Sequence, residues 1–427
     1  MPSYHELHYS DSQRGQRIFR KLAVSYTLLW LLEGAVRKWI PGTGDLFYVA
    51  RDIFMLVGLI RLSLLRADQP ANRWIRQLAI FLTTALLIYV TFQEFAGEFS
   101  NILIPIFGVR SYLAPLLLGV AAVMFGTSEA VRDISRVILI FGFPTLVVST
   151  LQVLSSPESF INKAVSSDSA FFVQFGVART TGFFASPAAI SGFLMVGFAL
   201  SLYSSQILKK PTTFKRLFLV SSFAVSIIIS GARLNILTGG IVLLFFALRE
   251  FSLQEWRALA RISSAFTGLL LASGLVVYLL PNVLQAFQMR FADAANSEDS
   301  GTRLADQAFG YLATPFQILG DGIGNNSQAG ISLGSGQPWV EWDASRWVVE
   351  LGLLGMVMAI LRSLVGVYLL CNLLINRKGT SDLRFAGVLS MAILLIAGEI
   401  TQFPSNQAYC AILVVLACKW PKQDITL

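Results

Sequence analysis

The residues best suited to chemistry lie in one long hydrophilic stretch, residues 282–345. Arg303 stands there between Asp299 and Asp306. A guanidinium presents its N–H donors as a planar fork, which suits phosphate oxygens. The alternative is a solvated charge paired with one of the two aspartates, worth under about 1 kcal/mol. Arg290 has the same two interpretations, with weaker support for binding.

A group of charges follows at the end of this stretch, with Glu341, Asp343 and Arg346 preceding an apolar run and Glu350 within it. A carboxylate here can take the proton of an attacking hydroxyl group. An acidic residue at a helix start can instead cap the helix, which contributes about 0.5–2 kcal/mol. We assign Asp343 to the cap, leave both roles open for Glu341, and count Arg346 among the substrate-binding candidates. Glu350 is expected to bond to neighbouring helices or loop backbone.

A third candidate is Arg233, in a tight turn between two apolar runs. A charge this close to hydrocarbon is costly and often marks a site. Its alternative role is an anchor that snorkels to the membrane interface. Asn235 and the small residues of the turn leave room for an anionic group, which favours binding.

Other charges interrupt apolar runs. Arg51 with Asp52 and Glu33 with Arg37 are expected to form structural pairs, because paired charges are tolerated where isolated ones are not. Single charges without an obvious local partner can line a substrate cavity or snorkel. They are Arg110, Glu399 and Arg362, with Arg179 added as a binding candidate from the Ser-rich loop 155–181.

These residues must be positioned by membrane-spanning helices. The 427 residues are 55% hydrophobic and only 14% charged, with a mean hydropathy of +0.64. The apolar residues come in runs of about 17–25, long enough to cross a hydrocarbon layer of about 30 Å as helices. The continuity of these runs argues against a β-barrel, whose strands alternate apolar and polar residues. We expect an all-α bundle in a single integral membrane domain, residues 1–427, with about twelve spans. The spans lie near 20–36, 46–65, 75–93, 101–126, 136–154, 182–207, 216–230, 234–249, 262–281, 346–376, 384–401 and 406–420.

The charge distribution predicts the orientation. About twenty-two basic residues fall in the terminal tails and one set of loops, and about eight fall in the opposite set. Positive charge gathers on the cytoplasmic side, so both termini are expected there. Residues 282–345 then form an extracytoplasmic loop between the ninth and tenth spans, with a short helix from Thr302 to Ala313 that stops before Pro315. The net charge of +8 reflects this topology, and we expect no nucleic-acid partner.

Known cofactor and metal patterns are missing from the sequence. It contains no phosphate-binding Gly-rich loop and no Gly-x-Ser-x-Gly elbow. Its three cysteines lie in or beside apolar runs, and its two histidines lie in the N-terminal tail without other ligand types nearby. We therefore expect no cofactor, no metal, and metal-independent handling of a phosphate leaving group.

Three segments, in this order, resemble the O-antigen ligase and polymerase superfamily of bacterial inner-membrane proteins. They are Ile229-Ser230-Gly231-Ala232-Arg233 ahead of an apolar span, Thr302-Arg303 through Pro315 to Gly320, Gly322 and Gly324, and Glu350-Leu351-Gly352-Leu353-Leu354-Gly355. The resemblance covers roughly 180–360. Glu33-Gly34-Ala35-Val36-Arg37-Lys38-Trp39 and Arg179-Thr180-Thr181-Gly182-Phe183 resemble a subgroup labelled polysaccharide polymerase.

The resemblance implies a multi-pass bacterial inner-membrane glycosyltransferase whose donor is a polyprenyl-diphosphate-linked oligosaccharide and whose acceptor is a glycan. Arg233 and Arg303 would hold the diphosphate, and Glu341 would act on the acceptor hydroxyl. Ligases of the superfamily carry a His-Asn pair about nine residues before the glutamate that matches Glu350, where this chain has Glu341-Trp342. This departure favours a polymerase, with a chain-length regulator among its possible partners.

Two alternatives stay open. A ligase would move a finished glycan onto lipid or protein, and the choice of acceptor distinguishes it from a polymerase. A flippase or other transporter of lipid-linked sugars would need charges from many spans around a central cavity. The long patterned loop argues against that second alternative.

Overall fold

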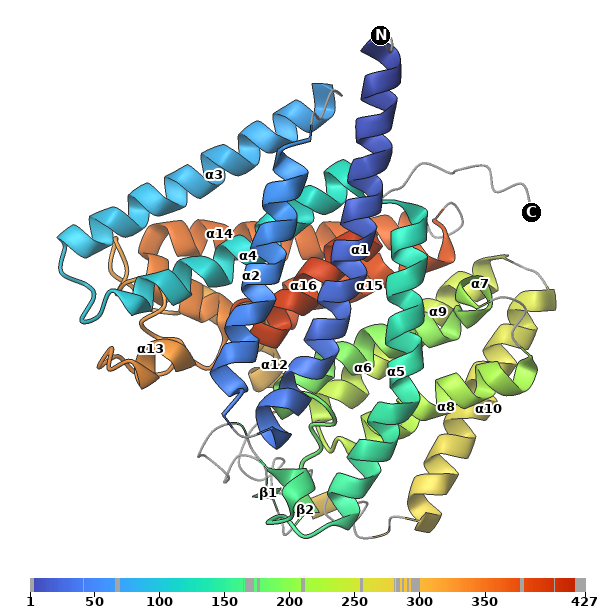
Figure 1. The fold of residues 1–427 in the computed structure, drawn as a ribbon. Helices are drawn as coiled ribbons and strands as arrows, with labels where there is room; N and C mark the ends of the chain where they lie inside the picture. The colour runs from blue at the N-terminus through green and yellow to red at the C-terminus, as the bar shows by residue number, and fades with distance from the viewer. Residues whose placement is uncertain are drawn as a thin grey trace.

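The computed structural model describes residues 4–40, 42–65, 70–163, 173–174, 177–208, 212–253, 256–279, 300–376, 380–402 and 404–418, together with the isolated positions 165, 281, 285, 288–289 and 292. This part of the chain is almost entirely helical (Figure 1). Its only strands are the two-residue antiparallel pair β1 (Val173–Gln174) and β2 (Val177–Ala178). The expected all-α class is confirmed.

The helices follow one another with short connections. In chain order they are α1 (Tyr4–Trp39), α2 (Gly44–Ser63), α3 (Pro70–Phe95), α4 (Leu103–Phe125), α5 (Ser128–Leu154), η1 (Phe160–Asn162), α6 (Pro187–Leu202), α7 (Ser204–Ile207), α8 (Thr213–Ile229), α9 (Arg233–Leu253), α10 (Trp256–Leu279), α12 (Ser300–Phe309), η3 (Gly310–Leu312), α13 (Gln328–Ser332), α14 (Asp343–Ile375), α15 (Asp382–Ala397) and α16 (Pro404–Ala417).

Local sequence sets several of these helix ends. The hydroxyls of Thr127, Ser186 and Thr212 each accept a hydrogen bond from a backbone N–H in the first turn of α5, α6 and α8. Such caps satisfy donors that have no partner inside the helix. Pro187 follows its cap at the first helical position, where a missing N–H costs nothing.

An aromatic cluster at the centre of the bundle joins three helices that are distant in sequence. Trp30 of α1 stacks on Tyr409 of α16, with ring centroids 5.9 Å apart, and packs edge-on against Phe193 of α6 at 6.2 Å. All three side chains are buried. In Figure 1 the N-terminal end of α1 extends beyond the other helices, whereas its central part runs between α2 and α5.

Six of the described helices, α3, α4, α5, α9, α10 and α14, are long and apolar enough to cross a membrane. Large apolar side chains are exposed along them, for example Phe81 on α3 and Leu270 on α10, as expected of surfaces that face lipid. These features fit a multi-pass membrane protein. Each of the twelve expected segments overlaps a helix, and segment 182–207 overlaps both α6 and α7. The number of crossings stays a prediction, because α6, α8, α15 and α16 are shorter than α3 or α14.

The loop expected over 282–345 is described continuously from residue 300. Its predicted short helix is present as α12, extended by the single turn η3, and the chain leaves helical structure before Pro315. The extracytoplasmic position of the loop stays a prediction. Arg290 lies outside the described residues.

Candidate functional site

Two of the three predicted catalytic residues are in contact. The Nη2 of Arg303 on α12 donates to Oε1 of Glu341, just ahead of α14, at 2.6 Å. The side chains are 39% and 45% exposed, so a ligand can reach them. The Arg303 guanidinium also lies 5.3 Å from the centroid of the Trp342 ring. An exposed pair of this kind contributes under about 1 kcal/mol to stability.

The short helix that carries Arg303 is fixed to two longer helices. Gln307 donates through Nε2 to the carbonyl of Ala397 at the end of α15, at 2.5 Å. In the adjoining turn η3, Tyr311 is buried and its hydroxyl donates to Ser363 Oγ on α14, at 3.1 Å. These bonds position α12, and with it Arg303, relative to the first turn of α14.

Asp343 fixes the segment that carries Glu341. Its buried carboxylate accepts hydrogen bonds from Arg362 Nη1 at 2.9 Å, from the Ile400 N–H at 2.9 Å, and from the Thr401 N–H and hydroxyl at 3.1 and 2.7 Å. The cap position of α14 is Trp342, and no side chain caps this helix. The assignment of Asp343 to a helix cap was therefore wrong. Its oxygens instead accept hydrogen bonds from Ile400 and Thr401, which lie between α15 and α16. Glu341 is not the cap residue either.

Arg362 is part of the same network, so the interpretation that it snorkels to the interface was also wrong. Its side chain is buried and lies over the Trp347 ring, 5.0 Å from the centroid. Besides Asp343, it donates to carbonyls at the end of α15: Leu395 at 2.8 Å, Leu394 at 3.2 Å, and Gly398. A buried guanidinium is tolerated here because one carboxylate and several carbonyls surround it.

Helix α14 is interrupted at Gly352, where it binds the glycine-rich loop that contains Gly320, Gly322 and Gly324. Gly352 has φ 56° and ψ −129°, outside the helical region, and the helix continues beyond it. The loop fills the gap, because Asp321 N–H donates to Val349 O at 2.8 Å and Leu353 N–H donates to Ile318 O at 3.1 Å. A Cβ at Gly352 would collide with the Ile318 carbonyl oxygen. Partial burial raises the pKa of the Asp321 carboxyl in this loop.

Gln93 on α3 holds the same loop from the other side. Its Nε2 donates to Leu319 O at 2.6 Å and Glu350 O at 2.8 Å, and its Oε1 accepts from Ile323 N–H at 3.1 Å. Gln93 was not among the site residues predicted from the sequence. Its position near the end of an apolar run, where a buried amide needs partners, was the available signal.

Glu350 and Arg346 on α14 are both buried. Glu350 accepts from the Tyr112 hydroxyl on α4 at 3.2 Å, as expected of a residue that bonds neighbouring helices. Arg346 lies 3.8 Å from Glu350 and 3.3 Å from Asp343, and it also contacts Thr401. Arg346 thus supports the site from inside, and its predicted contact with substrate stays a prediction. Glu399 accepts from Asn406 Nδ2 at 3.4 Å.

Arg233 is the first residue of α9, after a turn in which Gly231 has φ 63°. Asn235 is buried and donates through Nδ2 to Ser230 Oγ at 2.9 Å, which closes the turn. The convergence of Arg233 and Arg303 on one ligand stays a prediction.

Arg110 belongs to a second charged group, between α1, α2 and α4. It pairs with Asp52, while Arg51 pairs with Glu33 and lies 3.6 Å from Asp52. Glu33 also meets Arg37 at 3.3 Å, as predicted. Nearby, Lys38 is buried and donates to Thr181 Oγ1 at 2.9 Å and Gly182 O at 2.6 Å, which ties α1 to the chain just after Arg179.

Among the residues that the structure describes, no three His, Cys, Asp or Glu side chains gather as a metal site. The described part of the site offers the chemistry of an exposed guanidinium and an exposed carboxylate. Comparisons of the chain with protein-family models, with curated proteins and with solved structures found no match.

Proposed function

We propose that this chain is a membrane glycosyltransferase that polymerises oligosaccharide units delivered on a polyprenyl diphosphate. The observation that carries the proposal is the contact between Arg303 and Glu341, with both side chains partly exposed. A diphosphate-leaving reaction needs a cation beside the leaving group and a base beside the acceptor. Arg303 would be the cation and Glu341 the base, and the two side chains are joined by a hydrogen bond.

In this reaction the acceptor hydroxyl oxygen forms a bond to the anomeric carbon of the donor sugar, while the bond from that carbon to the diphosphate oxygen breaks. The electron pair goes to the diphosphate, whose growing charge Arg303 stabilises. The proton of the hydroxyl goes to Glu341. A single displacement of this kind inverts the configuration at the anomeric carbon.

The supporting network suits this role because catalysis needs groups held in place. Asp343, two residues after Glu341, is fixed by Arg362, Ile400 and Thr401. Arg303 is fixed through the docking of α12 on α14 and α15. A preorganised charge stabilises a transition state without reorganising during the reaction. In this proposal Arg233 holds the far side of the diphosphate, and the lipid tail lies between helices near its turn.

The test is polymer synthesis by the purified protein in nanodiscs, from a polyprenyl-diphosphate-linked repeat unit. Arg303→Ala and Arg233→Ala should each abolish long products while the protein remains folded. Asp306→Asn is a matched control, because Asp306 is exposed on α12 one turn after Arg303. Full-length polymer from both arginine variants would remove the mechanism.

The same assay separates the alternatives. A polymerase extends the lipid-linked glycan itself, whereas a ligase makes product only after a lipid or protein acceptor is added. A flippase moves the lipid-linked substrate across a vesicle membrane and forms no glycosidic bond. Product that depends on a separate acceptor would reassign this chain to the ligase class.

A further inference from the structure

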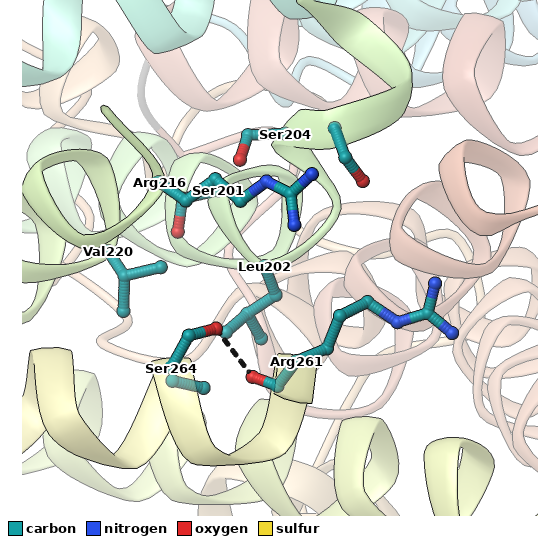
Figure 2. Close-up of a pocket in the computed structure, with 9 residues that line it drawn as sticks. Ser201, Leu202, Ser204, Arg216, Val220, Arg261 and Ser264 are labelled. Carbon is teal, nitrogen blue, oxygen red and sulfur yellow. Dashed lines mark hydrogen bonds between the residues drawn. The ribbon is translucent and has the colours of Figure 1, made fainter. Parts of the chain in front are cut away.

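The small pocket where α6, α7, α8 and α10 meet has no room for a substrate. Its polar lining comes from Ser201, Ser204, Arg216, Arg261 and Ser264 (Figure 2). The space inside it holds about one water molecule. The Ser264 hydroxyl donates to the backbone carbonyl of Arg261 at 2.8 Å, within α10. The polar segment between α15 and α16 differs, because it adjoins the proposed catalytic pair.

This segment, residues 398–402, is held against both elements that carry the pair. Just before it, the carbonyl of Ala397 accepts a hydrogen bond from α12 at 2.5 Å. At its end, Gln402 donates through Nε2 to the carbonyl of Val340, the residue before Glu341, at 3.2 Å. The segment therefore lies beside the two elements that present the guanidinium and the carboxylate.

Glu399 is the charged residue of this segment, and its side chain is partly exposed. It interacts electrostatically with Glu341, the proposed base, and with Asp343, Arg346 and Arg362. A second carboxyl group is thus a neighbour of the proposed base, in a position that a ligand can reach. The reaction described above gives this group no role.

The neighbourhood of Glu341 indicates which substrate Glu399 meets. In the proposed reaction Glu341 takes the proton of the acceptor hydroxyl, so the groups around Glu341 meet the acceptor glycan. A second carboxyl group there disfavours the diphosphate of the donor, because like charges repel. Sugar hydroxyls suit Glu399, because a carboxyl group accepts hydrogen bonds through both oxygens and donates one when it is protonated. Asn406 Nδ2 donates to Glu399 Oε2 at 3.4 Å, which ties the group to α16.

An exposed aromatic ring lies at the same entry to α14. Trp339 directly precedes Val340 and is 41% exposed. A sugar ring has an apolar C–H face and a polar edge, so a glycan site combines an apolar ring with a few placed polar groups. Trp339 and Glu399 supply one group of each kind next to the segment that carries Glu341.

We propose that Glu399 binds a hydroxyl group of the acceptor glycan, with Trp339 packed on the face of the same glycan. The identity of the ligand as an acceptor rests on the proposed transferase function, whereas the recognition of a glycan does not. Glu399 holds the acceptor beside Glu341 and takes no proton in the reaction. Its contact is made equally before and during the reaction, so its loss raises KM more than it lowers kcat.

Binding is measured on the full chain in nanodiscs, with the neutral oligosaccharide released from the lipid-linked repeat unit as the probe and sucrose as the comparison sugar. Glu399→Ala and Trp339→Ala should each weaken oligosaccharide binding about tenfold, which corresponds to about 1.4 kcal/mol. Glu399→Gln should bind nearly as well as the wild type, because an amide also accepts and donates hydrogen bonds. Arg303→Ala should bind normally, since the probe carries no phosphate. Glu158→Ala is the control, because Glu158 is an exposed glutamate of the other expected extracytoplasmic loop.

Polymerisation rates separate hydrogen bonding by Glu399 from proton transfer. Glu399→Ala should raise the KM for the lipid-linked unit about tenfold and leave kcat within about twofold of the wild type. Glu399→Gln should restore the wild-type KM. An equal loss of kcat in both variants, with KM unchanged, would make Glu399 a proton-transfer group and overturn the proposal.

The role of Glu399 and the transferase function can fail separately. If the wild-type chain polymerises and Glu399→Ala matches it in binding and in KM, only the role of Glu399 is overturned. If the wild type binds the oligosaccharide through Glu399 but makes no polymer, glycan recognition stands and the transferase function falls. A wild-type chain that binds the oligosaccharide no better than sucrose overturns the role of Glu399, as does equal weakening of binding by Glu158→Ala.

Discussion

The guanidinium of Arg303 lies 2.6 Å from the carboxylate of Glu341, although 38 residues separate them in the chain. The contact joins a short helix in the polar loop to the entry of α14. Both side chains remain partly exposed, whereas Asp343 and Arg346, two and five residues after Glu341, are buried. A ligand can therefore reach the Arg303–Glu341 pair, whereas the charged side chains that follow it in α14 are enclosed by protein, so the two groups can be tested separately.

Glu341→Gln should lower polymerisation by about 10²–10⁴-fold, the usual contribution of a general base, while leaving stability within about 1 kcal/mol. Glutamine keeps the size of the side chain and a hydrogen-bond acceptor for Arg303 but cannot take the proton. The measurements are the initial rate with the lipid-linked donor and the unfolding midpoint in detergent. Wild-type turnover in this variant would show that Glu341 only pairs with Arg303.

Gly352→Ala should displace the loop that packs against α14, although it changes neither Arg303 nor Glu341. The backbone at Gly352 is accessible mainly to glycine, and a Cβ would meet the carbonyls of Gln317 and Ile318, so the loop at 318–321 must shift. We expect a loss of about 2–4 kcal/mol in stability, and of activity, from strain and a displaced loop. Gly240→Ala is the matched control, because nothing lies near its Cβ position and alanine favours a helix. Equal behaviour of the two variants would contradict the role given to Gly352.

Local patterns in the sequence predicted part of this site. The hydroxyl residues Ser300 and Thr302 as caps and Pro315 as a stop indicated the short helix that is present as α12. The apolar run after Glu341 indicated that this residue lies just ahead of the next helix. Glu350 was expected to bond a neighbouring helix, and it accepts from Tyr112. These features depend on residues near one another in the chain, or on the general rule that buried charges find partners.

The supporting network could not be predicted, because its partners are distant in the chain. Asp343 meets Thr401 across 58 residues, and Gln93 meets Glu350 across 257. With Asp343 at the start of an apolar run, a helix cap was the simplest local interpretation, and nothing in the sequence shows that backbone donors from residues 400–401 arrive there. The positions of Arg233 and Arg110 relative to a ligand depend on long-range packing in the same way.

Cysteine labelling can test the predicted orientation. In a chain without Cys371, Cys410 and Cys418, Ser332→Cys should react with a membrane-impermeant maleimide in intact cells, because α13 belongs to the expected extracytoplasmic loop. Ser12→Cys on α1 should react only after the cells are opened. Both positions are exposed, so burial does not limit the reaction. Labelling of Ser12→Cys in intact cells would reverse the predicted topology and place Arg303 and Glu341 in the cytoplasm.

Asp343→Asn should destabilise the protein far more than Glu341→Gln, although the two residues are nearly adjacent. Removing the carboxylate leaves the buried charge of Arg362 without its ion-pair partner, which costs about 3–5 kcal/mol in comparable buried pairs. The unfolding midpoint in detergent and the yield of folded protein measure the effect. Arg362→Met added to Asp343→Asn should restore part of the loss, because the uncompensated charge is gone and an apolar chain fills the space. If the double variant is no more stable than Asp343→Asn, the backbone bonds to Ile400 and Thr401, and not the ion pair, dominate the contribution of Asp343.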